Sequence, residues 1–357
     1  MFFLTHSTLA EIVGDFLLHI LLRLGGLANL QSGWTINVEG EIQGRMSHSD
    51  TKKILEALRS RFELENAVVI PLQDEEGHVF QVRQGAEKYC LKLVPEATVS
   101  EVGSQLEFMA HLRAGGLPVV EVIDSIDEIL FHDARQSIGI LSRWVEGETL
   151  EARTDSETIY EVGTLLARLH MRSREFTPPS DFQRQRWEMV YAPREGEWLE
   201  EFFAERPLDA RSRRIIENGV RKSRSAVHQL GDDPKIYHMI HADFHGGNLL
   251  HDGEALHIID FEDCGWGHCL LDIVWPATLF AKRHDGPHAF LDPFLAGYER
   301  VRPLESLERA LLPDFLIGAL IGVIEMVYRS SVDQDGPIAK EWYEFAVRSL
   351  DLFTGNA

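Results

Sequence analysis

The stretch Ile240-His241-Ala242-Asp243-Phe244-His245-Gly246-Gly247-Asn248-Leu249-Leu250 decides how the rest of the chain is interpreted. After a polar turn comes a second run, Leu256-His257-Ile258-Ile259-Asp260-Phe261. Both are apolar, strand-like runs that end in a carboxylate or amide side chain. Asp243, Asn248 and Asp260 therefore come in the order that phosphoryl transfer needs: a carboxylate to orient a hydroxyl, then an amide and a second carboxylate for Mg²⁺. The pattern predicts a kinase core.

The composition is that of a soluble globular protein with an acidic balance. The 357 residues are enough for two lobes, each with its own core. Thirty-five basic and 57 acidic residues give a net charge of -22, which disfavours nucleic acid as a partner. The same charge is compatible with a cationic small-molecule acceptor. Oligomeric state is left open by these properties.

Cysteine content and hydropathy indicate a cytoplasmic protein without a membrane partner. Three cysteines (Cys90, Cys264 and Cys269) are too few for a disulfide framework, and an odd number fits a reducing compartment. No apolar run approaches the ~20 residues of a membrane span. The apolar run at 16–22 is short and is not preceded by a basic segment, which argues against a signal peptide.

The chain divides into an N-terminal extension (1–45), a nucleotide-binding lobe (46–145) and a catalytic and acceptor-binding lobe (146–357). Either Met46 is the natural start, or residues 1–45 form an N-terminal helix packed on the small lobe. The mass of the protein made from its native gene would separate these hypotheses. Periodicity in the small lobe predicts helices at 51–62 and 99–114 and strands at 67–72, 78–82, 88–94, 118–123 and 137–145.

Lys92 lies among apolar residues of the third predicted strand. It is either an edge-strand charge or a clamp for phosphate, and the downstream motifs favour the clamp. Glu107 lies beside the apolar face of the following helix and is expected to pair with Lys92, with Glu101 as the competitor. Gly77 alone marks the turn expected to lie over the nucleotide.

The pattern changes from strand to helix at 146–150, which predicts a hinge. Adenine is expected to hydrogen-bond to backbone groups between Ser142 and Val145. Beyond the hinge, residues 173–206 are irregular in pattern. Helices are predicted at 156–170, 208–230, 271–280, 289–301, 304–329 (broken at Pro313) and 338–353.

With these motifs in order, residues 50–350 resemble the aminoglycoside-phosphotransferase-like family, which includes choline and homoserine kinases. The resemblance implies an α+β, protein-kinase-like two-lobe fold, with an N-terminal antiparallel sheet plus helix and a mainly helical C-terminal lobe. It also implies ATP and Mg²⁺ as cofactors and a small-molecule alcohol as acceptor. The short interval between Asp260 and Asp272 leaves no room for a phosphorylatable activation loop.

The resemblance also implies residue roles. Asp243 is expected to be the catalytic base, and Asn248 and Asp260 the Mg²⁺ ligands. Lys92 is expected to contact the ATP phosphates. His241 and Asp272 are expected to support the catalytic loop structurally.

Two other classes of protein remain in view. A nucleotide-binding pseudokinase would lack turnover, although every expected catalytic residue is present. A metal-dependent hydrolase would use His241, Asp243 and His245, which strand alternation places on one face. The hydrolase hypothesis explains neither Asn248 nor Lys92, and tightly bound Zn would be its signature.

The acceptor site is the least determined part of the sequence. Glu325 stands in a nearly apolar run, where a carboxylate is costly unless it is paired. It either faces a basic neighbour or binds a substrate ammonium. Trp187 and Tyr191 are either core residues or cation–π partners of the acceptor. The acidic balance favours an amino-alcohol or aminoglycoside-like acceptor.

Overall fold

The structure is a computed structural model that describes residues 48–72, 78–130, 136–150, 155–187, 197–205, 208–283, 288–329 and 337–354. The predicted N-terminal extension, with its alternatives, therefore lies outside the described residues. The domain boundaries proposed at 45 and 145 stay predictions.

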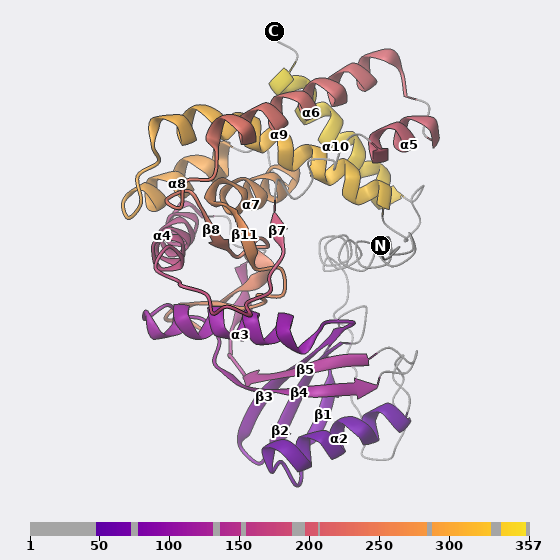
Figure 1. Ribbon diagram of the computed structural model, residues 1–357, viewed down its shortest axis with the longest axis vertical. Helices are drawn as coiled ribbons and strands as arrows, with labels where there is room; N and C mark the ends of the chain where they lie inside the picture. The colour runs from indigo at the N-terminus through magenta and orange to yellow at the C-terminus, as the bar shows by residue number, and fades with distance from the viewer. Residues whose placement is uncertain are drawn as a thin grey trace.

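A five-stranded antiparallel sheet forms one end of the molecule (Figure 1). Its strands lie in the order β1-β2-β3-β5-β4. The strands are β1 (Val68–Pro71), β2 (Val79–Gln84), β3 (Glu87–Pro95), β4 (Val122–Leu130) and β5 (Gln136–Arg143).

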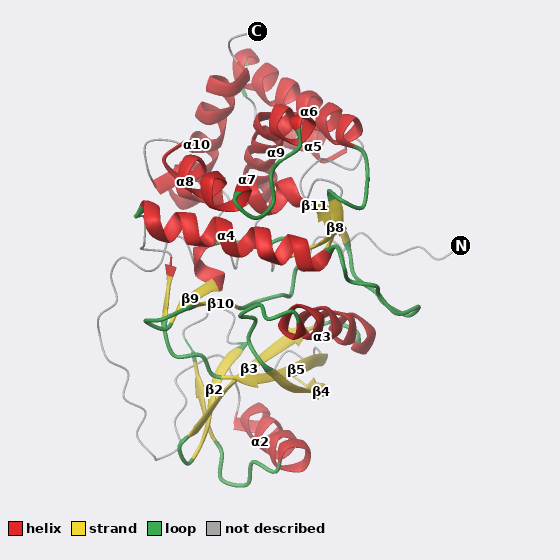
Figure 2. Ribbon diagram, turned by 90° about the vertical axis from the view of Figure 1, so that its left-hand side faces the viewer, coloured by secondary structure: helices red, strands yellow, loops and turns green. Residues whose placement is uncertain are grey.

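Two helices cover the two faces of this sheet (Figures 1 and 2). Leu91 and Leu93 of β3 pack in one cluster with Ile54 and Leu58 of α2 (His48–Phe62). On the other face, Val94 packs with Val102 of α3 (Val99–Ala114). Because side chains alternate along a strand, Lys92 shares the face of Val94 and points toward α3 and the rest of the molecule.

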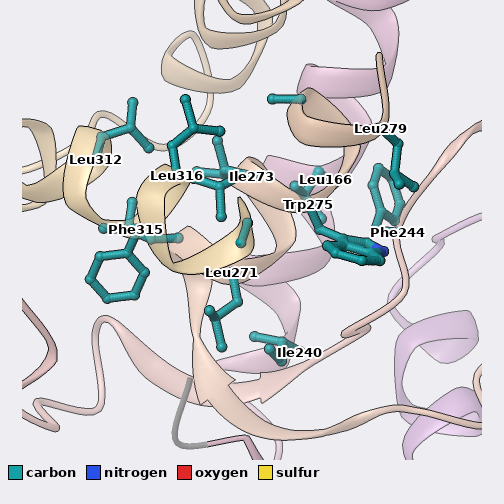
Figure 3. Packing of buried hydrophobic residues seen from close by; sticks show 14 of the residues in the cluster. Leu166, Ile240, Phe244, Leu271, Ile273, Trp275, Leu279, Leu312, Phe315 and Leu316 are labelled. Atoms are coloured by element: carbon teal, nitrogen blue, oxygen red, sulfur yellow. The ribbon is translucent and has the colours of Figure 1, made fainter. Parts of the chain in front are cut away.

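The remainder of the chain is mainly helical and holds one large apolar core, part of which is drawn in Figure 3. The helices are α4 (Ser156–Ser173), α5 (Glu197–Glu205), α6 (Ala210–Leu230), α7 (Cys269–Arg283), α8 (His288–Glu299), α9 (Ser306–Arg329) and α10 (Pro337–Thr354). Capping side chains define several starts: Asp155 accepts from the Thr158 amide at α4, and Asp209 accepts from the Arg211 amide at α6.

Short strands carry the sequence motifs at the junction between the sheet and this core. β11 (Gly265–His268) pairs antiparallel with β8 (Tyr237–Ile240) and parallel with β7 (Arg186–Trp187). β9 (Leu249–His251) pairs with β10 (Leu256–Ile258) and β6 (Glu148–Thr149). The antiparallel sheet, the two covering helices and the helical body confirm the predicted fold class.

Two sequence-based expectations about elements are wrong. The strand expected at 118–123 begins instead at Val122, because Pro118 has no amide hydrogen and its carbonyl accepts from the Ile258 amide (2.8 Å). Val120 donates to the Ile258 carbonyl (3.2 Å), so this segment pairs with β10. The helix expected to break at Pro313 continues through it as α9. Packing of α9 on nearly all sides outweighs the hydrogen bond that proline removes.

One helix also departs from the expectation of no membrane-length run. Ser306–Tyr328 of α9 is long and apolar enough to cross a membrane by length and composition. Of its most apolar window, 78% is buried inside the protein. Burial of that extent is what a core helix shows, and the length test alone is weak evidence.

Helices α4 and α8 cross closely enough that glycines are needed on both. A Cβ on Gly163 would lie 2.0 Å from the Phe294 carbonyl oxygen, and a Cβ on Gly297 would lie 2.0 Å from the Tyr160 carbonyl oxygen. Both obstacles are backbone atoms, which cannot rotate away. The two glycines therefore set the distance between α4 and α8.

We expect Gly163→Ala to lower the free energy of unfolding by about 1–3 kcal/mol or more, because the helices must separate to accept the methyl group. The matched control is Gly103→Ala in α3, where nothing lies within 4 Å of the added Cβ. That control should be neutral or stabilising by up to ~1 kcal/mol, since alanine is the better helix former. Urea denaturation of both variants measures the difference, and equal values would contradict the steric explanation.

Candidate active site

Asp243 is buried in the loop after β8 and is held by three donors. Its Oδ2 accepts from Asn248 Nδ2 at 2.6 Å and lies 3.4 Å from His245 Nε2. Its Oδ1 accepts from the indole Nε1 of Trp275 at 3.2 Å. Burial would raise the pKa of Asp243, but His245 and His241 together outweigh burial and hold that pKa below its usual range. The carboxylate is therefore ionised and fixed in direction.

Asp272, in the first turn of α7, fixes the backbone just before Asp243. Its Oδ2 accepts from the His241 amide (2.9 Å) and its Oδ1 from the Ala242 amide (2.7 Å). Ala242 has a φ of +67°, a conformation that non-glycine residues rarely adopt. His170 Nε2 also lies 3.1 Å from Asp272 Oδ2. The buried carboxylate thus holds a strained turn in place.

His241 joins the two motif loops. Its Nε2 donates to the Ile259 carbonyl (3.1 Å), and its Nδ1 accepts from the Asp243 amide (3.3 Å). Burial lowers the pKa of His241, so the ring is neutral and these bonds assign its hydrogen to Nε2. Both ring nitrogens of His241 bond to the backbone, which is compatible with the structural role expected for this residue. The ring therefore has no nitrogen available to bind a transition metal.

Lys92 reaches across from β3 to the loop between β10 and β11. Its Nζ lies 2.7 Å from Asp260 Oδ1 and 2.6 Å from Glu262 Oε2. Burial alone would lower the pKa of Lys92, but the two carboxylates outweigh burial and raise it above its usual value. Asp260 has a φ of +61°, so this second functional carboxylate also follows strained backbone. Lys92, Asp243, Asn248 and Asp260 belong to one connected region.

The donor set of this region fits magnesium. Asn248 Nδ2 donates to Asp243, which leaves the amide oxygen as its ligand atom, and Asp260 contributes carboxylate oxygens. Mg²⁺ is usually held by one or two such side chains together with substrate phosphates and water. Within the described residues, no group of three or more His, Cys, Asp or Glu side chains is arranged to hold a metal without a substrate.

The residues expected at the nucleotide site have different outcomes. The expected ion pair between Glu107 and Lys92 is not formed: Glu107 is exposed on α3, and Glu101 instead completes the N-terminal capping box with Thr98. Ser142 lies in β5 opposite Cys90, and Val145 follows two residues after β5. Contacts of this segment with adenine stay a prediction, and Gly77 lies outside the described residues.

Of the three residues expected to bind the acceptor, the structure describes Trp187 and Glu325. Trp187 is half-buried, packs against the main core and donates its indole hydrogen to the Asp263 carbonyl (2.7 Å). Glu325 is half-buried on α9 and Tyr191 lies outside the described residues. Roles for these three toward an acceptor stay predictions.

The structure brings four residues to the site that the sequence does not single out for phosphoryl transfer. The sequence indicates His245 only as a transition-metal ligand, although it lies next to Asp243. Glu262, two positions after Asp260, shares Lys92 with it. Trp275 lies one turn after Asp272 on α7, a spacing that was available in the sequence. Arg184 donates to the Glu262 and Cys264 carbonyls, and no pattern in the sequence connects it with them.

The fold and the site together define a protein-kinase-like phosphotransferase. The chain resembles the microcompartment-associated aminopropanol kinase with a TM-score of 0.67, at 21% identity, over 81% of this chain and 91% of that one. Residues 68–310 match the model of the phosphotransferase enzyme family. This chain belongs to that family and is an ATP-dependent kinase, which confirms the resemblance drawn from the motifs and disfavours the hydrolase and pseudokinase alternatives.

Curated relatives agree with this assignment. Amicoumacin kinase of Bacillus subtilis (strain 168) is 24% identical over 296 residues, which cover 75% of this chain and 84% of the relative. A homoserine kinase of Polaromonas naphthalenivorans (strain CJ2) is 27% identical over 233 residues, 63% of this chain and 70% of the relative.

The buried position of Asp272 predicts a pH dependence that separates activity from stability. Burial raises the pKa of Asp272 to about 6, above its value in the unfolded chain. Its contribution to stability is therefore full below pH 3.8 and is lost as pH rises through about 6. Acidification from pH 7.5 to 5.5 should protonate Asp272 and weaken its hydrogen bonds to the catalytic loop, so kcat should fall. The protonation of Asp272 should not lower the melting temperature over the same range.

Steady-state rates and melting curves at both pH values measure this split. Asp272→Asn, which does not titrate, should have a lower kcat at pH 7.5, and its kcat should not show the fall near pH 6 that the wild type shows. A parallel fall of kcat and melting temperature, or the same fall of kcat near pH 6 in Asp272→Asn, would contradict the assignment.

Proposed function

We propose that this kinase transfers the γ-phosphoryl group of ATP to a hydroxyl of a small cationic acceptor, an amino alcohol or an aminoglycoside-like molecule. The observation that carries the proposal is the fixed, ionised carboxylate of Asp243 beside the Lys92–Asp260 pair. The cytoplasm is the proposed setting, and neither nucleic acid nor membrane is proposed as a partner. None of the three cysteines forms a disulfide, which is compatible with a reducing compartment.

Each side chain contributes positioning or charge. Asp243 orients the acceptor hydroxyl and takes its proton as the oxygen attacks. Asn248 holds the direction of Asp243 and, with Asp260, provides oxygen ligands for Mg²⁺. Bound Mg²⁺ supplies positive charge to the phosphates. Lys92, already cationic beside Asp260, provides a second positive group for phosphate oxygens.

The cationic nature of the acceptor is proposed from charge and from relatives. The chain carries a net charge of -22, and carboxylates crowd the site. Burial and the charges of Asp243, Glu262 and Asp260 raise the pKa of Asp263 well above its usual range, which shows how dense the negative potential is. Homoserine and aminopropanol, which name two of the similar kinases, each carry an amine and a hydroxyl group.

Substitution of the two carboxylates should separate transfer from nucleotide binding. Asp243→Ala should reduce transfer by at least about 10³-fold and leave the affinity for Mg·ATP within a few-fold, because it removes the base and no nucleotide contact. Asp260→Ala should weaken Mg·ATP binding itself. Single-turnover rates and calorimetric titration with AMP-PNP measure the two effects. Wild-type turnover in Asp243→Ala would show that the role assignment is wrong.

The acceptor class is tested by a matched panel of alcohols. Amino alcohols should give kcat/KM values about 10-fold or more above those of the same alcohols without the amine, because an unpaired cation-binding carboxylate rejects neutral analogues. Glu325→Gln should reduce that preference, whereas Asp314→Asn on the same helix, near Lys222 of α6, should not. An ATPase-coupled assay measures both, and equal use of aminated and neutral acceptors would refute the cationic class.

A further inference from the structure

Residues 181–187, here called the strap, run along α3 and end in β7. The Gln183 amide donates to Ser104 Oγ (2.8 Å), and Arg184 Nη1 donates to the Glu101 carbonyl (3.4 Å). Ser100 Oγ donates to the Asp181 carbonyl (3.4 Å). Phe182 lies edge-on to Trp266 of β11 with ring centroids 6.3 Å apart. The strap is thus fastened to the nucleotide-lobe helix and to β11.

The other side of the strap holds residues 259–264, here called the Asp260 loop. Arg184 Nε donates to the Cys264 carbonyl (2.6 Å), and Arg184 Nη2 donates to the Glu262 carbonyl. The Asp263 carbonyl between them accepts from Trp187 Nε1 (2.7 Å) and Gln185 Nε2 (3.2 Å). Three consecutive carbonyls of the loop therefore take their hydrogen bonds from strap side chains.

This loop is difficult to hold by itself. It carries three acidic side chains, those of Asp260, Glu262 and Asp263, within a few residues, and Asp260 has positive φ. Like charges repel in a partly buried site, and strained backbone persists only when its surroundings hold it. The ion pair expected between α3 and Lys92 is also absent, since Glu107 is exposed. Contacts through the strap take its place in linking α3 to the site.

We propose that Arg184 is a positioning residue that sets the conformation of the Asp260 loop, and through it the affinity for magnesium-bound nucleotide. The inference rests on Asp260 as the proposed Mg²⁺ ligand. Arg184 acts through the backbone of the loop, since its contacts there are with the Glu262 and Cys264 carbonyls.

The chemistry of the contact requires arginine. The guanidinium donates from Nε and Nη2 to two carbonyls at once and from Nη1 to a third on α3. Lysine keeps the charge but has a single ammonium, which cannot reproduce this planar fork. Arg184→Lys therefore tests geometry at constant charge, and Arg184→Met removes both. Arg186→Met is the matched control, since Arg186 is an exposed cation in the same strap that lies over the Tyr237 ring.

The experiment has two readouts that do not depend on an acceptor. Hydrogen exchange of residues 259–266 in the nucleotide-free protein should be faster in Arg184→Lys than in the wild type and unchanged in Arg186→Met. Calorimetric titration with AMP-PNP should show affinity about 10–100-fold weaker in the presence of Mg²⁺, the usual effect of losing a support behind a metal ligand. Affinity without Mg²⁺ should change by less than about 3-fold. In transfer assays, KM for Mg·ATP should rise while KM for the acceptor stays constant.

Three results would overturn the proposal. The first is wild-type loop exchange and nucleotide affinity in Arg184→Lys with only a lower melting temperature, which would make the residue purely structural. The second is an equal loss in Arg186→Met, and the third is an equal loss with and without Mg²⁺. If Arg184→Met does not fold, Arg184→Lys and Trp187→Phe, which removes one bond to the Asp263 carbonyl, carry the test. A wild type whose nucleotide binding ignores Mg²⁺ would refute the role of Asp260, while loop exchange would still decide the role of Arg184.

Discussion

The two hydrogen bonds that Asp272 accepts from the His241 and Ala242 amides are the constraint on which the site depends. They hold Ala242 in the left-handed backbone conformation, which is unfavourable for alanine, and that conformation sets the orientation of Asp243. The Asp272 side chain has no exposed surface. Its negative charge is stabilised by the hydrogen bonds that it accepts. Burying the charge of Asp272 costs folding free energy, and in return the orientation of the Asp243 carboxylate is fixed.

The same solution recurs at the second motif. Asp260 also has positive φ, and its loop is held from behind by backbone contacts to the strap. In each case a carboxylate needed for chemistry stands on strained backbone, and the restraint comes from a residue distant in the chain: Asp272 for the first and Arg184 for the second. The apolar core around Phe244 and Trp275 (Figure 3) provides the rigid base for these restraints. The site is thus built from loops whose freedom is removed by their surroundings.

Local pattern was sufficient for the fold class and for selecting Asp243, Asn248 and Asp260 as candidate site residues, because both depend on short-range order. Alternation in β3 and helical spacing in α4 report burial directly, and Asp243, Asn248 and Asp260 follow one another within one motif region. Local pattern could not predict which side chains pair with one another when tertiary packing determines the pairing. Glu107 lies at an acceptable helical position, yet α3 turns it to solvent, and Lys92 pairs with Glu262 instead. Arg184 is 80 residues from the carbonyl it binds, and no periodicity connects them.

The contact of Lys92 with Asp260 and Glu262 links the two lobes by charge. The lysine comes from the sheet and the carboxylates come from the other lobe, so the positive and negative groups compensate each other across the junction. The lysine and aspartate side chains are only 21% and 13% exposed, and salt screens a partly buried pair much less than a surface pair. The relative placement of the two lobes is therefore coupled to a salt-resistant contact within the site itself.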